Sequence, residues 1–168
     1  VGLTNDWLDT DIDQIVEDEN LNDREKELLE NSSSRILEVI KRDGRLDRIA
    51  RDIAHHFPRR GFFGKGMVVS VDKYTVVRMY DKVQKYWAEE KKQLVKERNE
   101  AKTHDERVAL TERLNYMNKV EMAVVISKED GEEEKLAAQG LDITMHRKKM
   151  EAITPDGKDI EDRFKDKD

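Results

Sequence analysis

The sequence predicts a helix-rich α/β fold, in which a long helical hairpin is inserted beside a short parallel sheet. Two apolar runs, MVVSV at residues 67–71 and VEMAVVIS at residues 120–127, lack polar alternation and are typical of buried strands. The segment between them has helical spacing, and two strands joined by a long helical crossover lie parallel. Charged residues make up 42% of the chain and hydrophobic ones 36%, which indicates long exposed helices rather than a thick core.

The chain has 168 residues, enough for one domain or for part of a larger one. Residues 1–32 are acidic and weakly periodic, so we expect an acidic linker or short helices there. Asn22 and Glu25 have the spacing of a capping box, which favours a helix that runs towards Arg42. We therefore place a domain boundary at about residue 33.

A second helix is expected after Gly44, which is suited to end the preceding one. Pro58 ends this second helix, because a helix rarely continues through the residue before a proline. Its apolar residues are spaced three and four apart and share one face: Leu46, Ile49, Ile53 and Phe57.

A helical arm is expected over about residues 76–118. Its first helix carries an apolar seam formed by Val76, Tyr80, Val83, Trp87 and Leu94. Thr103 and Glu106 form a second capping box, which predicts a hairpin turn into an antiparallel helix. Beyond the second apolar run we expect a short helix that ends at Gly140 and a turn at residues 155–157.

Composition excludes several classes of function. The net charge of −6 argues against a broad basic surface, so any contact with DNA must be local. The absence of cysteine excludes disulfides, thiolate catalysis and cysteine-based zinc sites. No run of about 18 apolar residues exists, and the acidic start is unlike a signal peptide. We expect a soluble, cytoplasmic protein that does not associate with membranes.

The glycines of GFFGKG, at residues 61–66, are similar in composition to a phosphate-binding loop. Such a loop needs a strand before it and a helix after it, so that the helix N-terminus points at the phosphates. Here a predicted helix precedes the glycines and a predicted strand follows them. Gly66 also stands where the loop needs the serine or threonine that binds magnesium. We therefore interpret these residues as a connecting loop and expect no cofactor there.

No metal or catalytic site is expected either. The acidic run at residues 9–13 starts like a calcium loop, but Gln14 and Asn20 stand where that loop needs glycine and glutamate. His55 and His56 are adjacent, so on a helix they point about 100° apart and cannot chelate one ion. With 38 acidic residues, proximity in sequence singles out no carboxylate pair.

The residues that follow the first apolar run are the best candidates for a binding site. The carboxyl end of a strand in an open α/β sheet faces the ligand crevice, together with the next helix N-terminus. Hydroxyl, ammonium and main-chain N–H groups there are suited to hold a DNA phosphate. The candidates are Ser70, Lys73, Thr75 and Arg78. The alternative is ordinary helix capping and surface charge, which is common at helix starts.

Three stretches carry a resemblance to a known family: RLDRIARDIAHHFPRRGFFGKGMVVSVDKYTVVRMYDKV, then VEMAVVIS, then EEEKLAAQGLDITMHRKKM. Together they resemble the motor (restriction, R) subunit of type I restriction-modification enzymes, at the start of its second RecA-like helicase domain. The resemblance implies that residues 33–168 are part of such a domain, that GKGMVVS is the strand of helicase motif IV, and that the arm is an insertion.

The resemblance also implies an ATP-dependent endonuclease that translocates DNA. The whole subunit would bind ATP and Mg²⁺, act on double-stranded DNA and associate with the methylation and specificity subunits. The nucleotide-binding and nuclease motifs of the family are absent from this chain, so we expect an inactive fragment. Ser70 and Lys73 match positions that approach the DNA backbone. Lys73 stands where many relatives have arginine, and a lysine makes a point contact rather than a bidentate one.

A second reading comes from a different class of function. In it the chain is a non-enzymatic α/β interaction module that binds a partner protein through its helical arm. The residues by themselves leave both readings open.

Overall fold

The computed structural model describes residue 34 and residues 36–166, and their regular structure is helical. The elements are α3 (Asp43–His56), the 3₁₀ turn η1 (Phe57–Arg59), α4 (Lys73–Glu100), α5 (His104–Lys119), α6 (Glu132–Ala137), α7 (Thr144–Glu151) and α8 (Ile160–Lys165). Residues 36–40 are also helical. The capping box predicted at Asn22 and the acidic segment before residue 33 lie outside the described residues.

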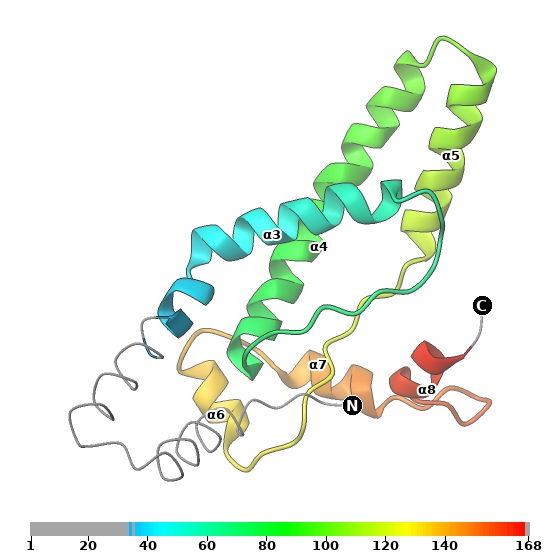
Figure 1. Cartoon of the computed structure of the whole chain (residues 1–168). Helices are drawn as coiled ribbons and strands as arrows, with labels where there is room; N and C mark the ends of the chain where they lie inside the picture. The colour runs from blue at the N-terminus through cyan, green and yellow to red at the C-terminus, as the bar shows by residue number, and fades with distance from the viewer. Residues whose placement is uncertain (1–33, 35, 167–168) are drawn as a thin grey trace, which may run out of the picture.

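The predicted parallel sheet is wrong. The described part of the chain contains no β-strand, so a partial RecA-like fold built on a sheet is not supported. Residues 63–70 and 120–129 are extended, but they run through the molecule without forming a ladder (Figure 1). In the second segment, main-chain oxygens that a ladder would use accept hydrogen bonds from α7 instead. Arg147 donates to the carbonyl of Ile126 at 2.8 Å and to that of Ser127 at 2.6 Å.

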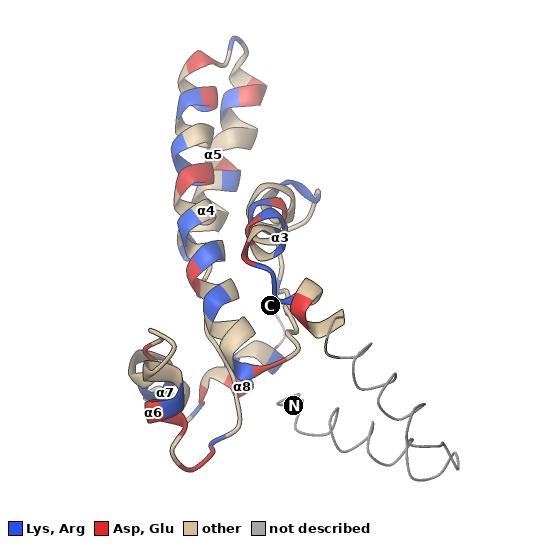
Figure 2. Ribbon diagram, turned by 90° about the vertical axis from the view of Figure 1, so that its left-hand side faces the viewer, with Lys and Arg blue, Asp and Glu red and all other residues tan. Residues whose placement is uncertain are grey.

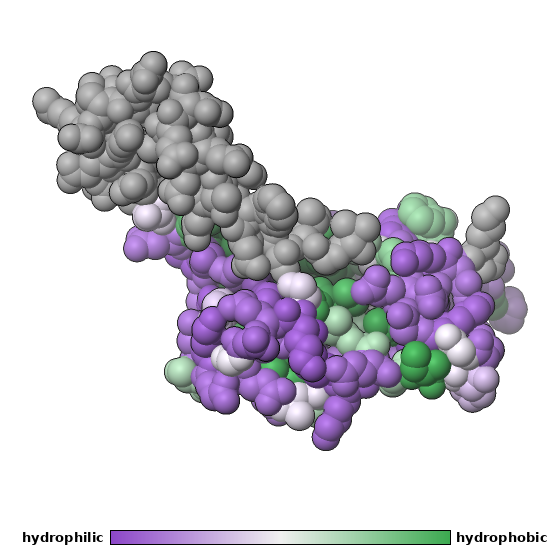
Figure 3. Space-filling model, turned by 90° about the horizontal axis from the view of Figure 1, so that it is seen from below, coloured by the Kyte–Doolittle hydropathy of each residue, from purple (hydrophilic) through white to green (hydrophobic). Residues whose placement is uncertain are grey.

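The first extended segment is also not buried, contrary to the prediction. Met67, Val68 and Val69 are 66%, 47% and 58% exposed. No main-chain hydrogen bond of residues 66–70 is formed within the described part of the chain. Seen from below, hydrophobic side chains gather in the middle of a largely hydrophilic face (Figure 3). A β-branched run thus indicates an extended backbone, whereas burial and pairing depend on a neighbouring strand.

The larger core forms where α3 crosses α4 and where α5 packs along α4 (Figure 1). Ala50 and Ala54 are among its most buried residues, because small side chains let α3 approach α4 closely. The predicted apolar face of α3 is only partly buried. Leu46 lies in the core, whereas Ile49, Ile53 and Phe57 pack at its edge. The buried members are Leu46, Ala50, Ala54, Met79, Val83, Tyr86, Trp87, Leu94, Leu114 and Met117.

Helices α4 and α5 form an antiparallel pair that extends from the rest of the structure (Figure 1). The capping box predicted from Thr103 and Glu106 is present, with both reciprocal hydrogen bonds at 3.2 Å. Trp87 bridges the two helices, since its indole N–H donates to the Met117 carbonyl at 3.2 Å. The two helices are thus held by a buried hydrogen bond as well as by apolar packing.

A smaller core joins the start of α4 to α6, α7 and the second extended segment. Its buried members are Val77, Val124, Ile126, Leu136 and Ile143. Gly140 follows α6 with φ +74°, in agreement with the predicted helix end, and the turn predicted at residues 155–157 is present. This second core fixes the position of α6 beside the start of α4, where the candidate residues lie.

Candidate nucleic-acid interface

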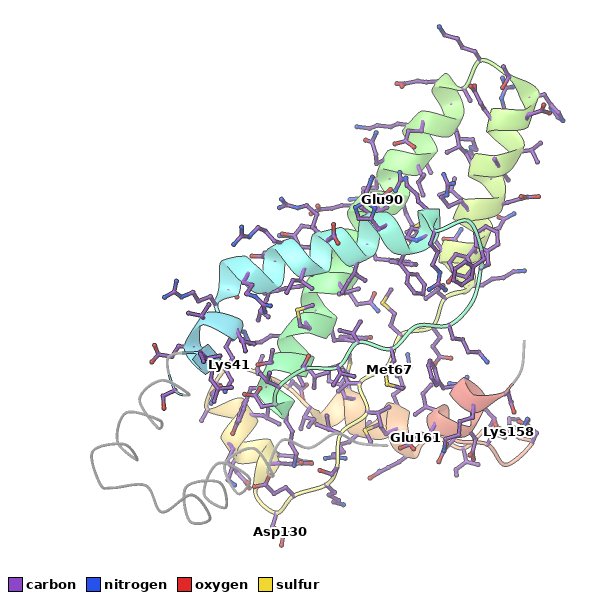
Figure 4. All side chains as sticks on the ribbon, in the orientation of Figure 1. Lys41, Met67, Glu90, Asp130, Lys158 and Glu161 are labelled. Atoms are coloured by element: carbon purple, nitrogen blue, oxygen red, sulfur yellow. The ribbon has the colours of Figure 1, made fainter. Side chains whose placement is uncertain are left out.

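The candidate interface is built around the N-terminus of α4. Asp72 precedes the helix in an extended conformation, and its carboxylate accepts the Thr75 main-chain N–H at 2.6 Å. Burial alone raises the pKa of Asp72, but hydrogen bonds from Lys41 and Thr75 outweigh burial and hold the pKa below its ordinary value. The main-chain N–H groups of Lys73 and Tyr74 have no acceptor within the helix, as at any helix start. Lys41, which lies 2.6 Å from Asp72, is labelled beside this helix end in Figure 4.

Lys73 faces α6 and the loop before it. Its ammonium lies 3.0 Å from a carboxylate oxygen of Glu129 and 3.6 Å from one of Glu132. Only 12% of the Lys73 side chain is exposed. The ammonium is therefore held by two acids that are more than fifty residues away in sequence.

Glu129 and Glu132 differ in burial and in their other partners. Glu132 is buried and also pairs with the buried Arg147, whose Nε donates to Glu132 at 2.7 Å. Glu129 is exposed and shares its carboxylate between Lys135 and Lys73. Hydrogen bonds from Lys135, which has the largest effect, and from Lys73 lower the pKa of Glu129 to about 2. Glu129 is thus ionised at neutral pH and is the partner that an incoming anion can replace without uncovering a buried charge.

Thr75 and Arg78 do not present donors at this end of the helix. Thr75 is 3% exposed, and its hydroxyl oxygen has no hydrogen-bond partner within the described residues. The Arg78 guanidinium contacts Asp43 at 2.9 Å and the Lys41 carbonyl at 3.3 Å, on the side of α3. Since residues five apart on an α-helix point about 140° from each other, Lys73 and Arg78 face different neighbours.

Ser70 lies just before the helix, half-buried, and forms no hydrogen bond within the described residues. The structure thus groups Ser70, Lys73 and the first N–H groups of α4 at one end of the helix. Sequence reasoning missed Glu129, Glu132 and Arg147. The acidic run EEE at residues 132–134 was visible, but nothing in it indicated that it lies against Lys73.

The loop with glycines has a structural explanation. Helix α3 precedes it, as predicted, but the segment that follows it is extended and is not the predicted strand. Gly61 has φ +84°, a conformation that favours glycine. A Cβ atom at Gly66 would overlap the ring of Phe57. These two glycines are needed for a turn and for close packing.

Three of the four histidines, His55, His56 and His146, form ion pairs or ring contacts. His55 lies 3.2 Å from Glu90, which in Figure 4 is labelled beside the end of α3. His146 is buried with its ring edge-on to Tyr80, with 4.7 Å between ring centres. Burial lowers the pKa of His146, and the charges of Asp81 and Asp142 offset part of this effect. Among the described residues, no three His, Asp or Glu side chains are grouped as metal ligands.

Comparison with known proteins gave one similarity. A protein from Methanocaldococcus jannaschii, described as "Putative type I restriction enzyme MjaIXP endonuclease subunit", is 29% identical to this chain over 80 residues. The match covers 46% of this chain and 8% of that protein. No family model and no solved structure matches. No helix in the described residues is long and apolar enough to cross a membrane.

Proposed function

We propose that this chain is a segment of the restriction subunit of a type I restriction enzyme, and that this subunit translocates double-stranded DNA with ATP. The observation that carries the proposal is the 80-residue similarity to the M. jannaschii endonuclease subunit. That subunit is far longer than the matched segment, since the match covers 8% of it. We accordingly assign ATP, Mg²⁺ and the nuclease chemistry to other parts of the subunit, and the methylation and specificity subunits are its partners.

The contribution that we assign to this chain is a contact with the DNA backbone at the start of α4. The Ser70 hydroxyl, the Lys73 ammonium and the first main-chain N–H groups of the helix are the kinds of donor that bind phosphates. In this proposal a phosphate replaces Glu129 beside Lys73, while Glu132 stays with Arg147. The contact is electrostatic and is made at one point, because an ammonium cannot bind a phosphate through two parallel hydrogen bonds as a guanidinium does.

Thr75 and Arg78 have supporting roles in this proposal. Thr75 is buried beneath the helix start, where it helps to fix the first turn. Arg78 ties α4 to the start of α3 through Asp43. Their substitution would act on the position of the helix rather than on a phosphate.

The test uses the Lys73→Gln variant of the complete subunit. It measures the DNA concentration at which stimulation of ATP turnover is half-maximal. We expect weaker stimulation, and a salt dependence of DNA binding whose slope is smaller by about one. Lys135→Gln is the matched control, because it also removes a cation from Glu129 but lies on α6. It should leave the DNA dependence unchanged.

The proposal fails if Lys73→Gln and the wild type respond to DNA alike. An interaction module that binds a partner protein through the α4–α5 arm would then be the better account of this chain.

A further inference from the structure

Five side chains at the end of α3 form a continuous stack. The Arg60 guanidinium lies over the ring of Phe57, 3.7 Å from its centre, and over the ring of Phe62, at 4.3 Å. On the other side, Tyr116 stacks on Phe57 with 6.3 Å between ring centres and on Phe63 with 4.6 Å. We call these residues, Phe57, Arg60, Phe62, Phe63 and Tyr116, the aromatic stack. The proposed contact at the start of α4 uses none of them.

Hydrogen bonds hold the loop of the aromatic stack in place. Arg60 donates from Nη2 to the carbonyl of Gly64 at 2.7 Å, and from Nε to that of Phe62 at 3.4 Å. The Tyr116 hydroxyl donates to the same Gly64 carbonyl at 2.6 Å. Arg60 and Tyr116, the two members that lie against Phe57, are thereby tied to one main-chain oxygen. The rings are ordered before any ligand arrives, which reduces the entropy lost on binding.

The outer members of the aromatic stack face solvent. Phe62 is 61% exposed and Phe63 is 52% exposed. Two exposed phenylalanines held in stacked positions are unusual for a surface without a ligand, since such area is normally buried or used for binding. They lie at either end of the stack, so each leaves part of a ring face open.

The charge of Arg60 is not neutralised within the described residues. Within the described residues its hydrogen bonds all go to main-chain carbonyls, and Nη1 forms none of them. The neighbouring Arg59, in contrast, pairs with Glu90 and with Glu97. An open cationic donor therefore lies beside open aromatic faces, an arrangement that suits a ligand with flat rings and an anionic backbone.

We propose that the aromatic stack binds single-stranded nucleic acid, with an unpaired base on the face of Phe62 and the adjacent phosphate at Nη1 of Arg60. Proteins that bind single strands combine aromatic platforms with basic side chains in this way, and a duplex keeps its base faces covered. Charge favours this ligand over an apolar protein surface, because an apolar partner would cover the guanidinium without supplying an anion. The inference goes beyond the contact at Lys73, which involves a phosphate and no base.

The experiment measures fluorescence anisotropy of a labelled 20-nucleotide oligodeoxythymidylate with the 168-residue chain, and of a duplex of equal length. We expect the single strand to bind more tightly than the duplex. Phe62→Ala should weaken single-strand binding by about 5- to 100-fold. Phe62→Leu should weaken it similarly, because leucine keeps apolar area but has no ring face. Phe164→Leu, at another exposed phenylalanine, is the matched control and should bind like the wild type.

Thermal unfolding followed by circular dichroism checks that each variant is folded. Three results would overturn the proposal: no oligonucleotide binding by the wild-type chain, equal affinity for the duplex, or wild-type affinity in Phe62→Leu. The last result would mean that no base stacks on the Phe62 ring. None of them bears on Lys73, which is tested with duplex DNA in the complete subunit.

Discussion

Glycine is needed at position 66 because the main chain passes close to the Phe57 ring. A Cβ atom there would lie 3.0 Å from the Phe57 Cζ and closer still to its neighbour in the ring. The ring cannot move easily, because Arg60 covers one of its faces and Trp87 packs nearby, with 6.2 Å between ring centres. The glycine that looked like part of a phosphate-binding loop is there to let the chain pass a phenylalanine.

We predict that Gly66→Ala destabilises the fold by about 1–3 kcal/mol, because the new methyl group overpacks the Phe57 ring. Gly64→Ala is the matched control, since its nearest neighbour would be the Arg60 Nη2 at an ordinary contact distance of 3.6 Å. It should change stability by no more than about 0.5 kcal/mol. Urea unfolding followed by circular dichroism measures both. Equal effects of the two substitutions would contradict this account of Gly66.

At the scale of elements, the two extended segments have similar sequences and different surroundings. Val124 and Ile126 of the second segment are buried against Val77 of α4. Val69, in the first segment, is 58% exposed. The hydrophobic pattern is similar, but Val124 and Ile126 belong to a core, whereas Val68 and Val69 do not. Substitution of valines in the two places therefore separates a buried position from an exposed one.

We predict that Val69→Lys changes the free energy of unfolding by at most about 0.5 kcal/mol, as is usual for exposed positions. Val124→Lys, at a residue of the second segment that is 2% exposed, should cost about 3 kcal/mol or more because it buries an unpaired charge. Urea midpoints of the two variants give the comparison. A large loss of stability in Val69→Lys would mean that residues 66–70 are buried in the folded chain.

At the scale of the whole molecule, many acidic residues are used to hold helices together. Asp43 and Asp47 on α3 pair with Lys82 of α4, and Arg59 of η1 pairs with Glu90 and Glu97 on the other side of the crossing. Acidic and basic residues recur along both helices of the arm (Figure 2). The hydrogen bonds of Lys82 and then Arg78 lower the pKa of Asp43. Stability should therefore depend on pH through ion pairs that link elements.

We predict that stability falls in two stages as the pH is lowered. Burial holds the pKa of His146 below the ordinary 6.5, so the unfolded chain binds the extra proton and stability begins to fall below about pH 6.5. Carboxylates such as Glu129, with a pKa of about 2 against an ordinary 4.5, add a further loss below about pH 4.5. Urea midpoints measured from pH 8 to pH 3 should show both stages.

Substitution separates the two stages. His146→Phe should remove the first stage and keep the second, because it deletes the buried titrating group and retains a ring beside Tyr80. His104→Asn, at an exposed histidine of α5, should leave both stages in place. If His146→Phe showed the wild-type loss between pH 7 and pH 5, burial of His146 would not be its cause.

Much of the helical structure was predictable because its signals are local. Such signals depend on residues close together in sequence. They include the capping box of Thr103 and Glu106 and the helix ends near Pro58 and Gly140. The candidate site was predictable only as a position, the start of α4. Its ion pairs with Glu129 and Glu132 join residues that sequence spacing does not relate.

The sequence by itself determined the helices from α3 to α6 and the extended backbone of the two apolar runs, but not α7 and α8, since capping, periodicity and β-branching act within a few residues. Only the tertiary structure decided that the extended segments do not pair, because pairing needs a second backbone at the right distance, and Arg147 occupies the carbonyls of Ile126 and Ser127. It also decided that Lys73 is held by acids and that Arg60 lies between two rings. Electrostatic and stacking interactions depend on distance in space, which the order of residues along the chain does not specify.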